Sequence, residues 1–143
     1  MNASPEAIAL AEELRPALLR VYRQLRRESE AHGLSLLQSM LLVTIQHKPG
    51  ITIGELAELE RLRGPTMSGH VKQLEAGGLV LRTSPDPEDR RRVGLVVTEH
   101  GAALLEAVRR QRTDWLAQQL GRLSEAGRRA LGAAIAPLRE LGQ

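Results

Sequence analysis

Short polar and basic side chains gather on one side of a predicted helix in the middle of the chain. Between Gly64 and Ala76, the apolar residues Met67, Val71 and Leu74 repeat at helical spacing and mark a buried stripe. The residues off that stripe are Thr66, Ser68, Gly69, His70, Lys72 and Gln73. A helix that enters the major groove presents such side chains to base edges and phosphates. We therefore predict a DNA-reading face here, although the hydroxyls of Thr66 and Ser68 can instead hydrogen-bond the local backbone.

Arginines flank this helix on both sides. Arg61 and Arg63 precede it, where a guanidinium beside a helix N-terminus can hold a phosphate or a guanine. Three more arginines stand together at residues 90–92, after a stretch that reads as a loop. A narrow minor groove attracts such side chains, so Arg90 and Arg91 are the candidates to enter it.

The formal charge of the chain is concentrated in the same window. The 143 residues carry 20 Lys and Arg against 17 Asp and Glu, a net charge of +3. Residues 61–92 hold seven of the basic and four of the acidic residues, so the whole excess lies beside the polar helix face and the arginine loop. Asp89 would be repelled by phosphate. We expect it to orient a neighbouring arginine through a charge-assisted hydrogen bond.

The polar helix is predicted to be the second helix of a helix-turn-helix. Thr52 and Glu55 form a capping-box pattern that begins a first, shorter helix. The residues predicted to face inward from it and its turn are Ile53, Leu56, Ala57, Leu59 and Leu62. Pro65 suits the first position of the second helix, and we count it among the residues of the predicted DNA-binding site. That helix ends at two glycines, and we expect the first, Gly77, in the left-handed position.

Two short strands with a long loop between them follow the second helix. Alternating apolar residues predict strands at 79–83 and 93–97. The predicted inward face consists of Leu79, Leu81, Val93, Leu95 and Val97. Two prolines within residues 84–89 remove donors from any strand ladder, so this segment is predicted to project as a loop.

The motifs together resemble the MarR family of bacterial transcriptional regulators. The resemblance rests on Asp89-x-Arg91-x-x-x-Leu95-x-Val97-Thr98-x-x-Gly101, on Leu56-Ala57 and on Leu74-Glu75-x-x-Gly78-Leu79-Val80, and the chain length fits throughout. Residues 61–68 resemble a subgroup with a proline early in the recognition helix. The resemblance implies a mainly α (α+β) winged helix-turn-helix with a short third strand at Ile51. It also implies a homodimer on a pseudopalindromic operator, with Arg91 pivotal in the minor groove and Asp89 as its support.

Further helices are predicted on both sides of this lobe. Capping patterns at Ser4 and Ser35 begin helices that run to about residue 31 and up to Pro49, the second with Leu37, Met40, Leu41, Thr44 and Ile45 on its buried side. A long helix spans 99 to about 120. The last begins at Ser124, and Pro137 is expected to kink it or shift its end.

The chain is predicted to be one domain, residues 1–143. Residues 5–34 and 99–143 would form the dimerisation helices, and residues 35–98 the DNA-binding lobe. The apolar faces of the end helices are too long for so small a core, so we expect a second copy to cover them. A dimer would also place two recognition helices one DNA turn apart. The alternative is that the end helices pack only on each other.

Composition and spacing exclude several other functions. Cysteine is absent, so no disulfide or thiol switch is possible. The four histidines lack metal-binding spacing, and no phosphate loop or nucleophile elbow occurs, so we expect no metal, no cofactor and no enzymatic activity. The chain contains one Tyr, one Trp and no Phe, which favours duplex over single-stranded nucleic acid. No signal peptide or membrane-spanning run is recognised, so a cytoplasmic protein without a membrane partner is expected.

The sequence thus predicts a homodimeric, sequence-specific regulator of transcription that binds double-stranded DNA. We expect a repressor that a small-molecule ligand releases from its operator. The alternative is a winged-helix protein-interaction or dimerisation module without DNA binding. The family resemblance implies a ligand cleft between the dimerisation helices and the lobe. Tyr22, Met40, His47 and Trp115 either line that cleft or pack in the core and interface.

Overall fold

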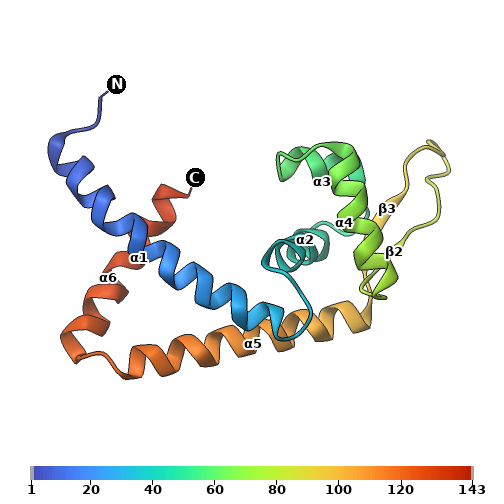
Figure 1. The fold of residues 1–143 in the computed structure, drawn as a ribbon. Helices are drawn as coiled ribbons and strands as arrows, with labels where there is room; N and C mark the ends of the chain where they lie inside the picture. The colour runs from blue at the N-terminus through green and yellow to red at the C-terminus, as the bar shows by residue number, and fades with distance from the viewer. Residues whose placement is uncertain (1, 143) are drawn as a thin grey trace.

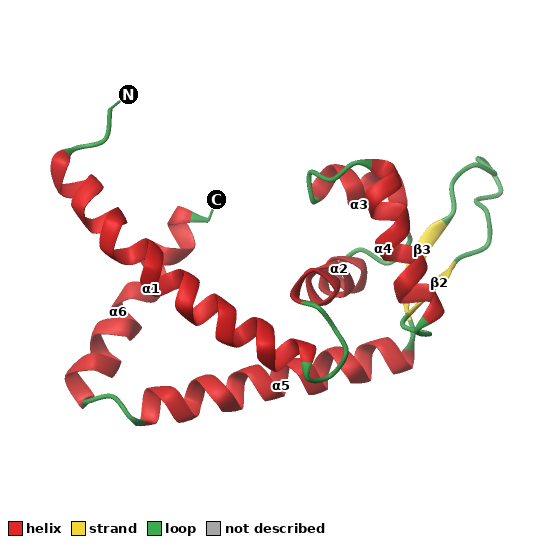
Figure 2. Cartoon of the chain, in the orientation of Figure 1, coloured by secondary structure: helices red, strands yellow, loops and turns green. Residues whose placement is uncertain are grey.

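The computed structural model describes residues 2–142 and contains six helices and three short strands in that range (Figure 1). The helices are α1 (Pro5–Glu30), α2 (Leu36–His47), α3 (Ile53–Leu59), α4 (Gly64–Ala76), α5 (Glu99–Gly121) and α6 (Glu125–Leu141). The strands are β1 (Ile51–Thr52), β2 (Val80–Arg82) and β3 (Gly94–Val97). Figure 2 shows how little of the chain is strand. The predicted mainly α winged helix-turn-helix is confirmed.

Most helices begin where the sequence places a short hydroxyl side chain. The caps of α1, α2, α3, α5 and α6 are Ser4, Ser35, Thr52, Thr98 and Ser124, and each side chain accepts a hydrogen bond from a backbone amide three residues on. Both predicted capping boxes, at Ser35 with Gln38 and at Thr52 with Glu55, are present. These bonds satisfy amides that the first turn leaves without a partner. The recognition helix α4 is the exception, because its start has no side-chain cap bond.

The three strands form one antiparallel sheet in the order β1-β3-β2. Ile51 lies opposite Leu95, and Val80 lies opposite Val97. The predicted third strand is therefore present. Leu79 is buried as predicted, but within β2 the predicted inward face is wrong by one residue, because Val80 is buried whereas Leu81 is 61% exposed. Leu79 closes the preceding helix turn instead of starting the strand, and a shift of one residue reverses the face of every side chain.

The end of α4 also differs from the prediction. Gly78, with φ of +70°, takes the left-handed position, whereas Gly77 remains helical at φ −78°. The amide of Gly78 donates to the carbonyl of Glu75 at 2.9 Å, and the amide of Leu79 donates to that of Leu74 at 2.9 Å. Both bonds satisfy carbonyls of the last helical turn, and this pairing requires the left-handed residue one place later than expected.

The core lies inside the lobe, between the helix-turn-helix, the sheet and the start of α5. Its most deeply buried side chains are Leu34, Leu41, Leu42, Ile45, Leu56, Met67, Val71, Leu74, Val80, Leu95, Leu105 and Val108. Because α5 contributes Leu105 and Val108, the lobe packs against more of the chain than residues 35–98. Two predicted inward residues, Met40 and Leu59, are each 50% exposed. Met40 lines a cavity beside α5, and Leu59 is the last residue of α3.

Close backbone packing fixes how α5 leaves the sheet. A side-chain carbon added at Gly101 would lie 2.2 Å from the carbonyl oxygen of Leu79, so only glycine fits there. The hydroxyl of Thr98 accepts from the amide of Gly101 and donates to the carbonyl of Gly78 at 2.6 Å. Helix α5 therefore starts rigidly from the end of the wing and extends toward the N- and C-terminal helices (Figure 1).

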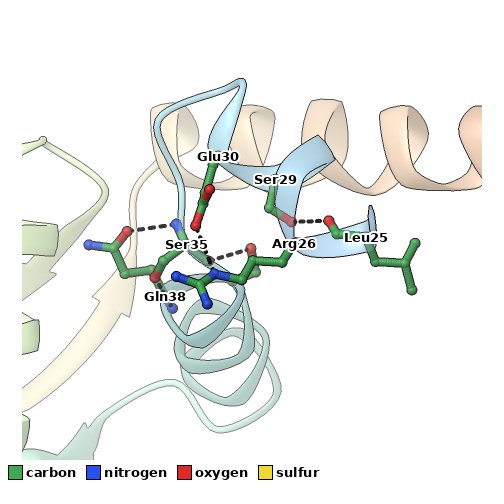
Figure 3. A network of polar contacts seen from close by, with 7 residues as sticks. Leu25, Arg26, Ser29, Glu30, Ser35 and Gln38 are labelled. Carbon is green, nitrogen blue, oxygen red and sulfur yellow. Dashed lines mark hydrogen bonds and ion pairs between the residues drawn. The ribbon is translucent and has the colours of Figure 1, made fainter. Parts of the chain in front are cut away.

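The junction between α1 and α2 carries several local polar contacts, and one hydrogen bond joins α1 to α5. Figure 3 shows the junction, where Arg26 pairs with Glu30, the hydroxyl of buried Ser29 donates to the carbonyl of Leu25, and Gln38 accepts from the amide of Ser35. Farther along, Gln111 of α5 donates to Glu28 at 3.0 Å. By contrast, α6 buries none of its residues. It continues through Pro137 to Leu141, so that proline does not end the helix.

Candidate DNA-binding interface

The recognition helix α4 has two chemically different faces. Met67, Val71 and Leu74 have no exposed surface and anchor the helix in the core. Of the predicted DNA-reading residues, Pro65, Thr66, Gly69, Lys72 and Gln73 are exposed, and Ser68 and His70 are half-buried. Core packing therefore directs the polar face outward along the whole length of the helix.

The start of α4 is open to an anion. Arg63 occupies the N-cap position without a side-chain hydrogen bond to the helix, and Pro65 follows in the first turn. The hydroxyls of Thr66 and Ser68 make no hydrogen bond within residues 2–142, so the local-capping alternative is not seen there. Amides at a helix N-terminus carry partial positive charge and suit a phosphate oxygen.

Arg61 lies in an unusual backbone conformation at the turn between the two helices. Its φ of +53° is the only positive value at a non-glycine among residues 2–142. The amide of Arg61 donates to Glu58 at 3.3 Å and that of Leu62 to Ala57 at 2.9 Å, which is the motif that Gly78 completes at the end of α4. The left-handed backbone conformation costs an arginine roughly 1 kcal/mol. No sequence pattern indicated this left-handed conformation at Arg61, because glycine is the usual residue at such a position.

The recognition helix also contacts the start of α2. The side-chain Nε2 of Gln38 donates to the side-chain Oε1 of Gln73 at 3.4 Å. His70 and Gln73 line a groove of about 390 Å³ together with Ser35 and Gln38. The side chain of Gln73 is therefore oriented by α2, whereas Thr66 and Lys72 project freely.

The tip of the wing is a closed turn that presents two arginines. In the wing loop, residues 84–93, the carbonyl of Asp89 accepts from the amide of Arg92 at 2.9 Å. The carboxylate of Asp89 accepts from the amide of Arg91 at 3.1 Å. Arg90 and Arg91 thus occupy the two central positions of the turn, and both are exposed. The prediction that Asp89 orients an arginine by a charge-assisted bond to its side chain is wrong: Asp89 binds the backbone amide.

The third wing arginine behaves differently from the other two. The guanidinium of Arg92 forms an ion pair with Glu55 on α3. The hydrogen bond from Arg92 holds the pKa of Glu55 below its usual range. Within residues 2–142, Arg90 and Arg91 make no ion pair. The spacing of 37 residues between Glu55 and Arg92 explains why sequence reasoning missed this contact.

Recognition helix and wing are joined at their base. Arg82 of β2 donates twice to the carboxylate of Glu75 on α4, at 3.0 and 2.9 Å. In Figure 1 the wing loop projects beside α3 and α4, at the end of the molecule away from α1 and α6. A rigid helix with a polar outer face and a hairpin with a cationic tip are thus presented by one lobe. These features define the protein as a winged helix-turn-helix of the DNA-binding class.

Comparison with known proteins identifies the family. The model of the MarR family matches residues 32–92. An HTH-type transcriptional regulator of Mycobacterium tuberculosis is 39% identical over 125 residues, 87% of this chain and 87% of that protein. The crystal structure of a transcriptional regulator protein from Pseudomonas aeruginosa has a TM-score of 0.83 at 30% identity, over 99% of each chain. The chain belongs to the MarR family of transcriptional regulators.

A further solved structure shares the fold. A mutant of Staphylococcus aureus MepR bound to an oligodeoxyribonucleotide has a TM-score of 0.70 at 22% identity, and the match covers 93% of this chain and 97% of that chain. The relatives are named as regulators of transcription and not as enzymes. No cluster of His, Asp and Glu in residues 2–142 is arranged to hold a metal ion. Over the same residues, no helix is both long and apolar enough to cross a membrane.

A cavity of about 450 Å³ lies between α2 and α5, apart from the DNA-binding face. Met40 and His47 line it as the sequence suggested, whereas Tyr22 and Trp115 do not. Two arginines of α5 also line the cavity. Arg112 donates to the hydroxyl of Ser39 at 2.8 Å, but its buried Nε has no hydrogen-bond partner in residues 2–142. Burial, and then the charge of Arg109, lower the pKa of Arg112.

Proposed function

We propose that this regulator binds a pseudopalindromic operator in double-stranded DNA as a homodimer. The observation that carries the proposal is the exposed polar face of α4 beside Arg90 and Arg91 of the wing tip, which make no ion pair in residues 2–142. The helix would read base edges in the major groove, and the wing arginines would enter the adjacent minor groove. The MepR structure bound to an oligodeoxyribonucleotide, which has the same fold, supports DNA as the partner.

Within this proposal each predicted site residue has a distinct task. Thr66, Ser68, His70 and Gln73 would meet base edges, and the absence of a side chain at Gly69 would allow close approach to the DNA. Lys72, Arg61 and Arg63 would contact phosphates, together with the open amides behind Pro65. Asp89 would support the wing turn without touching DNA. An operator on the chromosome also makes the cytoplasm the expected location.

The homodimer is supported by apolar side chains that the single chain leaves uncovered. On α6, Leu131, Ile135 and Leu138 are 48%, 51% and 37% exposed, and no residue of that helix is buried. On α1, Leu18 and Val21 are 45% and 42% exposed. Covering such surface gains about 25 cal/mol per Å². In the proposed division, residues 5–34 and 99–143 provide this interface, and residues 35–98 provide the DNA-binding lobe.

The regulator is proposed to be a repressor that a small anionic ligand removes from the operator. The cavity between α2 and α5 supports this, because Arg109 and Arg112 face it without an ion-pair partner in residues 2–142. Arg109 is exposed and Arg112 is half-buried, but the buried Nε of Arg112 has no hydrogen-bond partner in residues 2–142, and a bound carboxylate would supply one. Such a ligand shifts DNA affinity only if it binds the conformation that does not fit the operator more tightly.

Salt-dependent binding tests the DNA function. An operator selected from random duplex DNA should bind with an affinity that falls steeply as salt rises. Replacing Lys72 by alanine should flatten the slope of log affinity against log salt by roughly one unit, because one phosphate contact is lost. Lys48→Ala removes the same charge from the exposed end of α2 and should leave the slope unchanged. A protein-interaction module would instead show no salt-dependent duplex binding, and that result would refute the proposal.

A second measurement tests the effector. Small carboxylates should raise the unfolding temperature and lower operator affinity more than their neutral amides do. Arg112→Gln should abolish this difference, whereas Arg110→Gln, on the exposed side of the same helix, should preserve it. Equal effects of carboxylates and amides on the unaltered protein would exclude an anionic ligand.

A further inference from the structure

The wing loop is attached to the sheet by bonds that lie only at its base. The amide and hydroxyl of Thr83 donate to the carbonyl of Gly94 at 2.8 and 3.3 Å, and the amide of Gly94 donates back to the hydroxyl at 3.0 Å. Farther out, the amide of Asp86 donates to the carbonyl of Arg92 at 3.1 Å. These bonds keep the loop closed on itself. They do not fix its direction relative to the recognition helix.

One side chain links the loop to a different element. Within residues 2–142, the Arg92–Glu55 ion pair is the only side-chain hydrogen bond between the wing loop and the rest of the lobe. Glu55 uses its second oxygen to accept from the amide of Thr52 at 3.4 Å, which completes the capping box of α3. A groove of about 480 Å³ lies between the start of α3 and the loop, and Asp89 and Arg91 also line it.

We propose that Glu55 and Arg92 are positioning residues that tether the wing to α3 and thereby aim Arg90 and Arg91 at the minor groove. In this role Arg92 does not contact DNA, although it belongs to the same run of three arginines. The inference rests on the proposed wing contact with DNA. It adds that the first helix of the helix-turn-helix sets the direction of the wing.

The physical reason is the entropy of a long loop. A loop held in its binding direction loses less conformational freedom when the complex forms than one that is attached only at its base. The two side chains are 47% and 42% exposed, so solvent limits what the pair contributes. The expected effect is therefore modest. The direction of the effect is informative. If Glu55 acted only through its charge, its removal would strengthen operator binding, whereas loss of the tether weakens it.

Glu55→Gln separates the tether from simple electrostatics. Gln38 completes the capping box of α2, so glutamine can replace Glu55 without loss of the α3 cap. The tether predicts about two- to fivefold weaker operator binding, in the range of an exposed ion pair. Tighter binding would show that Glu55 acts only as a negative charge, and would overturn the proposal. Glu58→Gln removes the same charge from an exposed position on the same helix and is the matched control.

Arg92→Gln should cause the same fold-loss without changing the salt slope. A slope that falls by about one unit would mean that Arg92 neutralises a phosphate, and would overturn the tether. The double variant Glu55→Gln with Arg92→Gln should bind no worse than the weaker single variant, because both remove one interaction. Additive losses would contradict a shared tether. Each variant should unfold at a temperature close to that of the unaltered protein, which would establish that the lobe remains folded.

The two levels of the proposal fail in different ways. If Arg91→Ala binds the operator as tightly as the unaltered protein, the wing contact is wrong and the tether loses its purpose. If Arg91→Ala binds weakly while Glu55→Gln and Arg92→Gln bind normally, the wing contact stands and only the tether is wrong. Weaker operator binding by all three variants supports both the wing contact and the tether.

Discussion

The DNA-binding lobe and the end helices differ in how far they bury their apolar side chains. In the lobe, leucines such as Leu42, Leu56 and Leu74 have no exposed surface, because they lie in one core cluster built from α2, α3, α4, α5 and the sheet. In α6, Leu131 and Ile135 repeat at helical spacing but remain about half exposed. Both regions have amphipathic helices, so composition does not explain the difference. The lobe buries its apolar side chains within one chain, whereas within residues 2–142 those of α6 remain exposed.

The largest effect is expected from a change in the closed core. Leu42→Ala should lower the free energy of unfolding by about 2–5 kcal/mol, because it leaves a cavity in tightly packed surroundings. This loss should be present at every protein concentration in denaturant titrations. Leu131→Ala makes the same chemical change on α6, and its cost should grow with protein concentration, as expected for a residue covered only in a dimer. Equal, concentration-independent losses would remove the contrast between the two regions.

A charge placed on α6 should separate assembly from folding. Ile135→Glu should raise the dimer dissociation constant about a hundredfold, or roughly 3 kcal/mol, because each copy would bury an unpaired carboxylate. Sedimentation velocity across a dilution series measures this change, and circular dichroism should show a folded lobe. Arg129→Glu alters charge on an exposed position of the same helix and serves as a comparison. If the Ile135→Glu and Arg129→Glu proteins remain dimeric down to the same dilution, another surface forms the interface.

A smaller effect, confined to the lobe, is expected at the wing tip. Arg91→Ala should weaken operator binding by about 1–3 kcal/mol through the lost minor-groove contact. Dimerisation and unfolding should not change, because Arg91 is exposed and its carboxylate contact is through the backbone. Fluorescence anisotropy with the selected operator measures the loss. Arg110→Ala, an exposed arginine on α5, should bind normally, and equal losses in both variants would indicate a general charge effect.

Much of this contrast was predictable because its signals are local. Capping residues such as Thr52 and Ser124 lie within three residues of the amides they bind, so spacing alone predicts where those helices begin. The apolar period of α4 predicts which of its faces is buried, and therefore which can meet DNA. Along α6 the same kind of period is present, but periodicity does not say whether the partner is the same chain or a second copy.

The features that sequence reasoning missed depend on geometry beyond that range. The phase of β2 was wrong because the turn at Gly78 holds Leu79 within the helix end, so the strand begins at Val80. The role predicted for Asp89 was wrong because the turn places its carboxylate beside the backbone amide of Arg91. The carboxylate accepts from that amide instead of from a guanidinium. The partner of Arg92 lies on another element, and no spacing pattern records which distant carboxylate the folded chain brings near.

The smallest expected effect tests whether the left-handed Arg61 at the DNA-binding face lowers the free energy of unfolding of the lobe. Arg61 holds a left-handed conformation that glycine adopts without strain, as Gly78 does in the same motif at the end of α4. Arg61→Gly should therefore raise the free energy of unfolding by about 0.5–1 kcal/mol. The same change should weaken operator binding and lower the salt slope by roughly one unit if Arg61 neutralises a phosphate.

Opposite signs in the two measurements are the decisive outcome. Arg63→Gly is the matched variant, because Arg63 has φ of −68° and gains nothing from a glycine. It should lose DNA affinity without gaining stability, since an added glycine only increases the freedom of the unfolded chain. A destabilised Arg61→Gly protein would show that the arginine side chain contributes more to packing than its backbone conformation costs. The strained turn would then belong to the closed core and not to the DNA-binding surface.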